Sequence, residues 1–334
     1  MYGHIKLWRE EFVRALSLTL SHRGSSTLLA TSMQRTLTAL FISLVIFPHV
    51  ASSDGRTSAA VRVEDLTRSI PTRTGQYLTG SQFVQYVSKM NPQEREQAIR
   101  DEILKGNVPE FLRRLVPVEL HCELPSGKNL IATIFVLPDY LAIGSEDDFL
   151  RIPMNLHTAL AIADRFKFIL PTKKMVDAIF LQSRYHLVPQ PLPAGPQMRS
   201  TAYYWIHNQM IEDQARALGV RLGELVSGDK KDVVMTNRLA LNVERIAIYG
   251  WHRGPDQPIQ PLSTIHGANY ADYSHGIRLI SEMALIDGKL RSIYEILRDS
   301  SVANVLSDEG PIRLNWGFLS PHLDAPTVVT ASSN

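Results

Sequence analysis

The sequence has a single cysteine, Cys122, among its 334 residues. An intramolecular disulfide and a multi-cysteine zinc site are therefore both excluded. Cys122 follows His121 in a segment expected to be a strand, where neighbouring side chains point to opposite faces. The two residues therefore do not predict a Cys–His dyad, and Cys122 is expected to be a buried, inert thiol.

Charge is also sparse and nearly balanced. Lys and Arg together number 35, Asp and Glu 33, and the formal net charge is +2. The basic residues form no arginine-rich block and do not alternate with aromatic residues, which argues against nucleic-acid binding. The hydrophobic fraction of 44% is typical of a globular protein and not of a disordered one.

Established catalytic and cofactor-binding motifs are missing as well. The chain contains no internal repeat, no glycine-rich phosphate loop, no His-Glu-x-x-His pair and no Gly-x-Ser-x-Gly turn. This argues against nucleotide-dependent and redox enzymes, and it leaves the reaction to be inferred from individual residues.

The first 52 residues have the order of a secretory signal peptide. Arg35 precedes an apolar run over residues 37–50, and small residues follow at 51–53. The run is shorter than the roughly 20 apolar residues of a transmembrane helix, although an N-terminal anchor helix is the alternative. Met33 stands just before the run and is a candidate translation start. We therefore expect an exported bacterial protein, periplasmic or secreted, that meets a membrane only through its N-terminal segment.

Helical and β-rich segments then follow one another in blocks. This order predicts an α+β fold, with a mixed, largely antiparallel sheet and flanking helices in a single compact domain. We expect a polar linker over residues 53–80, the globular domain over 81–318 with a seam near the proline-rich stretch 189–196, and a flexible tail over 319–334.

The capping and turn residues give more local expectations. Helices are expected from the caps Ser81 and Asn91, over residues 108–115, from the cap Asn155, and over residues 172–183, 200–218 and 290–297. Strands or hairpins are expected at 116–137, 139–144, 223–235 with its turn at Gly228-Asp229, 245–250 and 270–280, and an irregular loop at 253–269.

Residues 247–278 hold the highest density of polar groups able to do chemistry. His252 ends an expected buried strand, where a side chain is held rigidly and still reaches a cleft, and the long loop after it is expected to fold over it. Asp272 and His275 would point to opposite faces of a regular strand and could meet only across a turn. The candidate site residues are His252, His266, Asp272, His275, Lys231 and Arg278.

Three mechanisms can use these groups. In the first, His252 or His275 is a general base oriented by Asp272, and Lys230, Lys231 or Arg278 stabilises developing negative charge. In the second, His252, His266, Asp272 and His275 bind zinc. In the third, Ser263 or Ser274 is a nucleophile with a histidine base. The structural alternative is that these histidines bond only to backbone carbonyls.

Part of this segment resembles a family of metal-dependent peptidoglycan enzymes. Trp251-His252, with Ser263, His266 and Asp272, resembles the metal motifs of D-Ala-D-Ala carboxypeptidases and L,D-endopeptidases. That resemblance implies zinc hydrolysis of cell-wall peptides. The departures are that the spacing differs, the two motif blocks are in reverse order, and Tyr249 and Gly250 stand where the family has its glutamate.

Together these features predict an exported hydrolase that acts on a cell-wall or extracellular polymer, without a cofactor or, in the alternative, with zinc. The other reading is a non-catalytic envelope protein that binds peptidoglycan or glycan through tryptophan and tyrosine side chains. Tyr203, Tyr204 and Trp205 are one such aromatic group, unless they belong to the core. The oligomeric state is not predicted.

Overall fold

The helices begin where the sequence supplies capping residues. The structure is a computed structural model that describes residues 63–124, 127–242 and 244–314, all within the compact unit Ser58–Asn334. The α-helices are α2 (Gly80–Val87), α3 (Pro92–Leu104), α4 (Leu156–Phe166), α5 (Lys173–Gln182), α6 (Thr201–Ala217) and α7 (Ile293–Arg298). Short 3-10 helices are η1 (Val63–Thr67), η2 (Glu110–Arg113), η3 (Pro196–Arg199), η4 (Asn237–Leu239) and η5 (Ala303–Val305).

Two of the predicted caps are confirmed and one is displaced. Asn91 caps α3 and Asn155 caps α4, each accepting backbone N–H bonds of the first turn. The first helix begins earlier than predicted, because Thr79 and Gln82 form a capping box that replaces Ser81 as its cap. The Ser81 backbone N–H and hydroxyl bind the Asp148 carboxylate instead.

The strands form one large sheet, one four-stranded sheet and two small pairs. Their bounds are β1 (Val116–Glu123), β2 (Asn129–Val136), β3 (Ala142–Gly144), β4 (Phe149–Arg151), β5 (Phe168–Ile169), β6 (Tyr185–His186), β7 (Val226–Ser227), β8 (Lys231–Val233), β9 (Ile248–His252), β10 (Pro258–Ser263), β11 (His275–Gly276), β12 (Ile280–Ser281), β13 (Met283–Ile286) and β14 (Lys289–Ser292).

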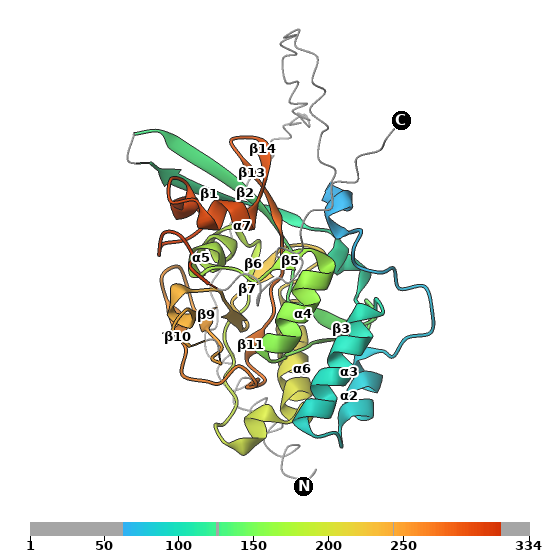
Figure 1. Cartoon of the computed structure of the whole chain (residues 1–334). Helices are drawn as coiled ribbons and strands as arrows, with labels where there is room; N and C mark the ends of the chain where they lie inside the picture. The colour runs from blue at the N-terminus through green and yellow to red at the C-terminus, as the bar shows by residue number, and fades with distance from the viewer. Residues whose placement is uncertain (1–62, 125–126, 243, 315–334) are drawn as a thin grey trace, which may run out of the picture. The chain divides into compact units, whose positions relative to one another are not determined.

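The pairing is largely antiparallel, as predicted. The large sheet has the order β14-β13-β2-β12-β5, with β1 on β2, and the second has the order β10-β9-β8-β11. Only β8 with β11 and β6 with β7 pair in parallel among the described strands. Helix α3 packs on α4 and α2 on α6, and Figure 1 shows these four helices beside the strands. The fold is therefore α+β.

The hairpin predicted over residues 223–235 is wrong. Strand β7 pairs with β6, whereas β8 pairs with β9 and β11. Gly228 has φ +100, and a Cβ there would lie 2.4 Å from the Leu187 carbonyl oxygen. The chain thus passes closely through the interior at Gly228 instead of turning at the surface, and it buries Asp229 and Lys230.

Two further predictions in the last third need correction. The loop expected over 253–269 contains β10, which pairs with β9; its prolines are tolerated because β10 is an edge strand. The strand expected over 270–280 is replaced by a turn at residues 273–274 and two short strands, β11 and β12, which are separated by residues 277–279. This turn decides the geometry of the candidate site.

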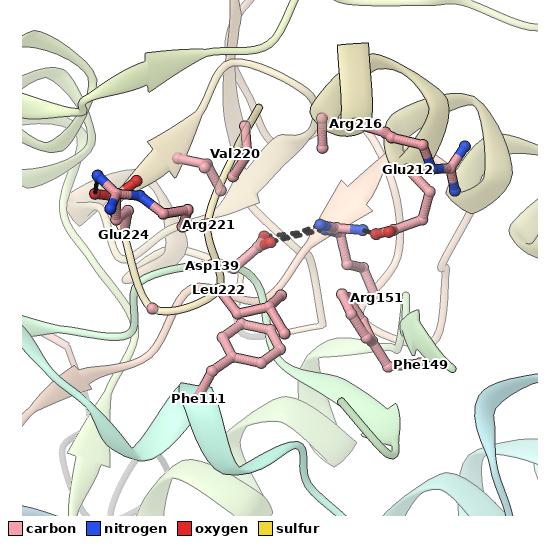
Figure 2. Close-up of a pocket in the computed structure, with 13 residues that line it drawn as sticks. Phe111, Asp139, Phe149, Arg151, Glu212, Arg216, Val220, Arg221, Leu222 and Glu224 are labelled. Carbon is pink, nitrogen blue, oxygen red and sulfur yellow. Dashed lines mark hydrogen bonds and ion pairs between the residues drawn. The ribbon is translucent and has the colours of Figure 1, made fainter. Parts of the chain in front are cut away.

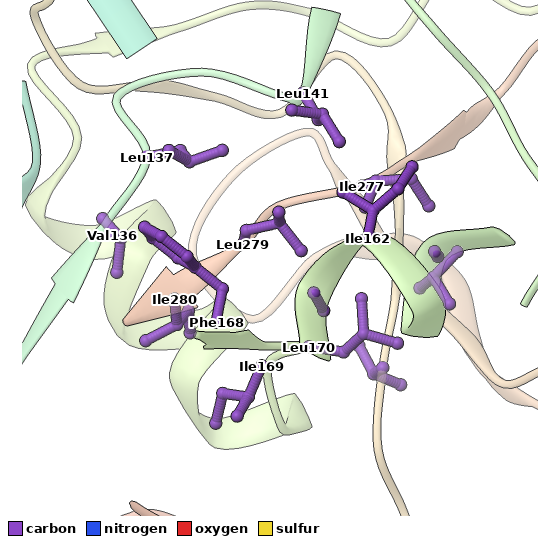
Figure 3. Packing of buried hydrophobic residues seen from close by; sticks show 14 of the residues in the cluster. Val136, Leu137, Leu141, Ile162, Phe168, Ile169, Leu170, Ile277, Leu279 and Ile280 are labelled. Atoms are coloured by element: carbon purple, nitrogen blue, oxygen red, sulfur yellow. The ribbon is translucent and has the colours of Figure 1, made fainter. Parts of the chain in front are cut away.

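The core joins segments from both sides of the proline-rich stretch 189–196. Val136 of β2 pairs with Ile280 of β12, which pairs with Ile169 of β5. Figure 3 shows these residues together with Ile162 of α4. All four are at most 2% exposed, so the two halves of the chain share one hydrophobic core.

Several predictions fall at or beyond the edges of this core. The signal region 1–52 and the tail 319–334 lie outside the described residues. The expected linker is described from Val63 on, where it packs on the core through buried Ile70. Cys122 on β1 is half-buried, beside a His121 side chain that faces solvent. Of the helices in the described ranges, none combines the length and apolar composition needed to cross a bilayer.

Candidate functional site

A turn brings Asp272 and His275 together, although a regular strand would separate them. The His275 backbone N–H donates to the Asp272 carbonyl at 3.1 Å. The Asp272 side chain reinforces the turn, because its Oδ1 accepts the Ser274 backbone N–H at 2.8 Å and the Ser274 hydroxyl. As a result, His275 Nε2 lies 3.9 Å from Asp272 Oδ2.

Tyr270 and His266 extend this pair towards solvent. The Tyr270 hydroxyl donates to Asp272 Oδ2 at 3.1 Å. The His266 ring stacks on the Tyr270 ring, with centroids 4.0 Å apart and planes 9° from parallel. Both rings are half-buried, whereas Asp272 and His275 are buried. The cluster therefore runs from a partly exposed pair of rings to a buried imidazole.

Lys231 joins the cluster through parallel strand pairing. It lies opposite His275 in the β8–β11 register, and its backbone N–H donates to the Ser274 carbonyl at 2.8 Å. Its ammonium nitrogen is 5.1 Å from the centroid of a Trp251 ring, within cation–π range. Trp251 itself has φ +55, a strained conformation for a bulky residue. Such strain tends to occur at functional sites.

Burial sets the protonation of the cluster. It lowers the pKa of His275 to about 4, so the imidazole is neutral at pH 7. Burial also raises the pKa of Asp272, but the neighbouring His275, the Ser274 hydrogen bonds and Lys231 outweigh it, and the net pKa is lowered. Burial and the Asp272 charge raise the pKa of Tyr270 to about 12, which keeps its hydroxyl a donor.

The ring nitrogens of His275 are buried without hydrogen bonds to described residues, which is unusual. The side chain is fully buried, yet neither ring nitrogen has a hydrogen-bond partner among the described residues. Buried polar groups are nearly always bonded in native proteins. Because Nε2 faces Asp272, Nδ1 is the nitrogen left to accept a proton from another molecule.

His252 is not part of this cluster. Its Nε2 lies 3.2 Å from Asp177 Oδ1 on α5, and its ring stacks on Phe180 with centroids 4.7 Å apart. The same Asp177 carboxylate accepts the Tyr249 hydroxyl at 2.7 Å and the Lys173 ammonium at 2.6 Å. His252 is therefore held in a second, separate cluster.

Arg278 is also elsewhere. Its guanidinium donates to the Leu137 and Val226 carbonyls at 3.0 and 2.7 Å and lies over the Tyr140 ring. It fastens three chain segments and does not face His275. The structure thus brings together four of the six predicted residues: Lys231, His266, Asp272 and His275.

The other two predicted mechanisms are not assembled by these contacts. His252 lies in a different cluster from the other proposed zinc ligands, and nowhere in the described ranges do three His, Cys, Asp or Glu side chains converge to hold a metal ion. The Ser274 hydroxyl donates to Asp272 and not to a histidine. Of the three mechanisms, acid–base chemistry at His275 is the one that this geometry fits.

A buried charge network next to the cluster could not be predicted from the sequence. The fully buried Lys230 donates to the Tyr273 carbonyl at 2.8 Å and lies 3.4 Å from His207 Nδ1, and burial lowers its pKa to about 8. Neighbouring Asp229 is buried with both carboxylate oxygens unpartnered by any described residue, and burial raises its pKa to about 6.

This network ends at a pocket of about 180 Å³. Arg151 lies at its base and binds Asp139 at 2.7–3.1 Å on one side and Glu212 on the other, as the dashed lines in Figure 2 show. Arg151 and Asp139 are buried, and the Arg151 guanidinium is shared between Asp139 and Glu212. We therefore regard these ion pairs as structural ties that join β4 to α6 through Glu212 and to the segment after β2 through Asp139. In the sequence, the one sign of these contacts is the charged residue Arg151 after the apolar residues Phe149 and Leu150.

Comparison with known proteins gives no relationship: the chain matches no protein-family model, and no curated protein or solved structure is significantly similar to it.

Proposed function

We propose that the protein is an acid–base hydrolase and that its centre is formed by Lys231, His266, Tyr270, Asp272 and His275. The observation that carries the proposal is His275 itself. It is a buried, neutral imidazole with two unused ring nitrogens beside an ionised carboxylate. A neutral imidazole with an unbonded nitrogen can accept a proton, which is the step that a general base performs.

The roles follow from the contacts. His275 Nδ1 takes a proton from a water molecule as the water oxygen attacks the substrate, and Asp272 stabilises the imidazolium that forms. The imidazolium then returns the proton to the leaving group. Lys231 stabilises negative charge on the substrate, because its ammonium lies over the Trp251 ring and interacts with the Asp272 charge. The Tyr270 hydroxyl fixes the Asp272 carboxylate.

We propose a cell-wall or extracellular polymer as the substrate. The signal-like N-terminal segment supports an exported protein, and the missing nucleotide and redox motifs support hydrolysis. A polymer also suits a centre that reaches the surface through the flat His266–Tyr270 pair. The second candidate, a non-catalytic envelope protein that binds glycan, is supported by half-buried Trp205, which lines a groove on α6.

Purified peptidoglycan sacculi provide the test. The full chain, His275→Asn and His252→Asn are each incubated with sacculi, and soluble fragments are separated and weighed by mass spectrometry. We expect the wild type and His252→Asn to release fragments at similar rates, because His252 lies in the other cluster. His275→Asn should release none above background, with its folding checked by circular dichroism.

The other outcomes are equally informative. If the protein binds to sacculi but releases no fragments, the hydrolase proposal is wrong and the glycan-binding alternative is favoured. Full activity of His275→Asn would remove His275 as the base. A wild type that neither binds nor cleaves sacculi would refute the cell-wall substrate.

A further inference from the structure

A groove along α6 is not used by the acid–base centre. It has a volume of about 310 Å³, at the lower end of the range of roughly 300–1,000 Å³ for small-molecule sites. Its helical wall is the stripe Trp205, Gln209, Glu212 and Arg216. The spacing of four, three and four residues places these side chains on one face of the helix.

Two of the carboxylates that line the groove are held in place from behind. Glu212 accepts from Arg151, as Figure 2 shows from the neighbouring pocket. On the opposite wall, Asp148 accepts the Ser81 backbone N–H at 2.9 Å and its hydroxyl. Burial raises the pKa of Asp148, but hydrogen bonds to Ser81 and Thr79 outweigh it, and the net pKa is lowered. Both groups are therefore oriented before any ligand arrives, which reduces the entropy lost on binding.

The chemistry of the lining points to a particular ligand. Ionised carboxylates only accept hydrogen bonds, so a partner must present donors. Trp205 adds a large flat apolar face that is half-buried against the core and half in the groove. A phosphate group would meet Asp147, Asp148 and Glu212 with Arg216 as the one cation in the groove lining, which disfavours anions.

We propose that this groove binds a neutral glycan chain, with a sugar ring on Trp205 and hydroxyl groups of the chain donating to Glu212 and Asp148. The inference rests on the proposed function, because it supplies a substrate subsite for that hydrolase. The placement suits a polymer. The Tyr204 hydroxyl donates to the Ala271 carbonyl beside Asp272, so α6 starts at the acid–base centre. From Trp205 to Arg216 the groove wall spans roughly 16 Å at 1.5 Å per residue.

Isothermal titration calorimetry with chitotetraose, the neutral tetramer of N-acetylglucosamine, tests the subsite. The full-length wild type should bind it, and Trp205→Ala should bind at least tenfold more weakly, because buried tryptophan contacts dominate such sites. Trp205→Phe should retain part of the affinity. Ile206→Ala is the matched control, since Ile206 is an exposed apolar residue on the same helix that does not line the groove.

His275→Asn separates this inference from the proposed function. It should bind chitotetraose as the wild type does while releasing no fragments from sacculi. Release of fragments by a wild type that does not bind chitotetraose would overturn the subsite and leave the hydrolase standing. Equal loss of affinity in His275→Asn would place the tetramer at the acid–base centre instead. Tetralysine that displaces chitotetraose, or binds in its place, would show that the groove recognises ammonium groups.

Discussion

Two clusters of the same composition lie beside the four-stranded sheet, and they differ in which atoms are already bonded. One contains His275, Asp272 and Tyr270 with Lys231 nearby. The other contains His252, Asp177 and Tyr249 with Lys173 nearby. In each, the tyrosine hydroxyl donates to the aspartate and the lysine ammonium lies near an aromatic ring.

In the second cluster the histidine ring is already bonded and stacked. Asp177 accepts bonds from His252, Tyr249 and Lys173, and the His252 ring is stacked on Phe180. These contacts tie α5 to β9. In the first cluster, the His275 ring lies 3.9 Å from Asp272, too far for a hydrogen bond. Residue types therefore do not distinguish a reactive centre from a structural contact, whereas the unbonded ring nitrogens of His275 do.

The strongest test of this comparison makes the same substitution in both clusters. Asp272→Asn removes the charge that stabilises the imidazolium of His275, so fragment release from sacculi should fall by about a hundredfold. Asp177→Asn should leave that rate within threefold. Its effect should be on stability, with a loss of about 1–3 kcal/mol in the free energy of unfolding measured by urea denaturation.

Circular dichroism of both variants provides the control for folding. Equal loss of rate in the two variants would mean that both clusters serve the reaction. A rate unchanged in Asp272→Asn would show that His275 works without its carboxylate or does not work at all.

The two clusters also show what the sequence could and could not reveal. Asp272, His275 and His266 lie within ten residues of one another, so their proximity was predictable. Lys231 joins them only through the parallel β8–β11 pairing, and Asp177 reaches His252 from 75 residues away. No local pattern reports such contacts, which is why His252 was assigned to the wrong cluster.

The same limit applies to the fold. The α+β class and the caps Asn91 and Asn155 follow from local signals, hydrophobic periodicity and capping chemistry. The hairpin predicted over 223–235 failed because its two strands pair with distant partners. Strand β7 pairs with β6 and β8 with β9, and between them Gly228 passes close to the Leu187 carbonyl.

The pH dependence of stability gives the next largest effect. Burial lowers the pKa of His275 to about 4, below the ordinary 6.5. Between these values the unfolded chain holds a proton on this ring that the native protein lacks, so stability falls as the pH drops from 6.5 to 4. His275→Leu has no group that titrates at this position. Relative to this variant, the free energy of unfolding of the wild type should fall by about 1.4 kcal/mol for each unit by which the pH is lowered in this range.

Urea denaturation of both proteins at pH 6.5 and 4.5 measures this difference, and groups common to both cancel. The rate of fragment release should likewise fall as the pH drops through about 4, because protonated His275 can no longer accept a proton. A stability difference that stays constant between the two pH values would show that the His275 ring is solvated in the native protein, and it would weaken its assignment as a preformed base.

The smallest effects should come from the two tyrosines. Tyr270→Phe removes a hydrogen bond to Asp272 Oδ2 while keeping the ring on which His266 stacks. The carboxylate then loses one of the groups that orient it, so the rate should fall about threefold, and the lost bond should cost about 1 kcal/mol of stability. Tyr249→Phe removes the corresponding bond to Asp177, and it should cost about 1 kcal/mol of stability with no change in rate. Paired rate and urea measurements on the two variants decide the matter. If the effects are interchanged, the reactive centre is the cluster around His252, and the unused nitrogens of His275 have a different cause.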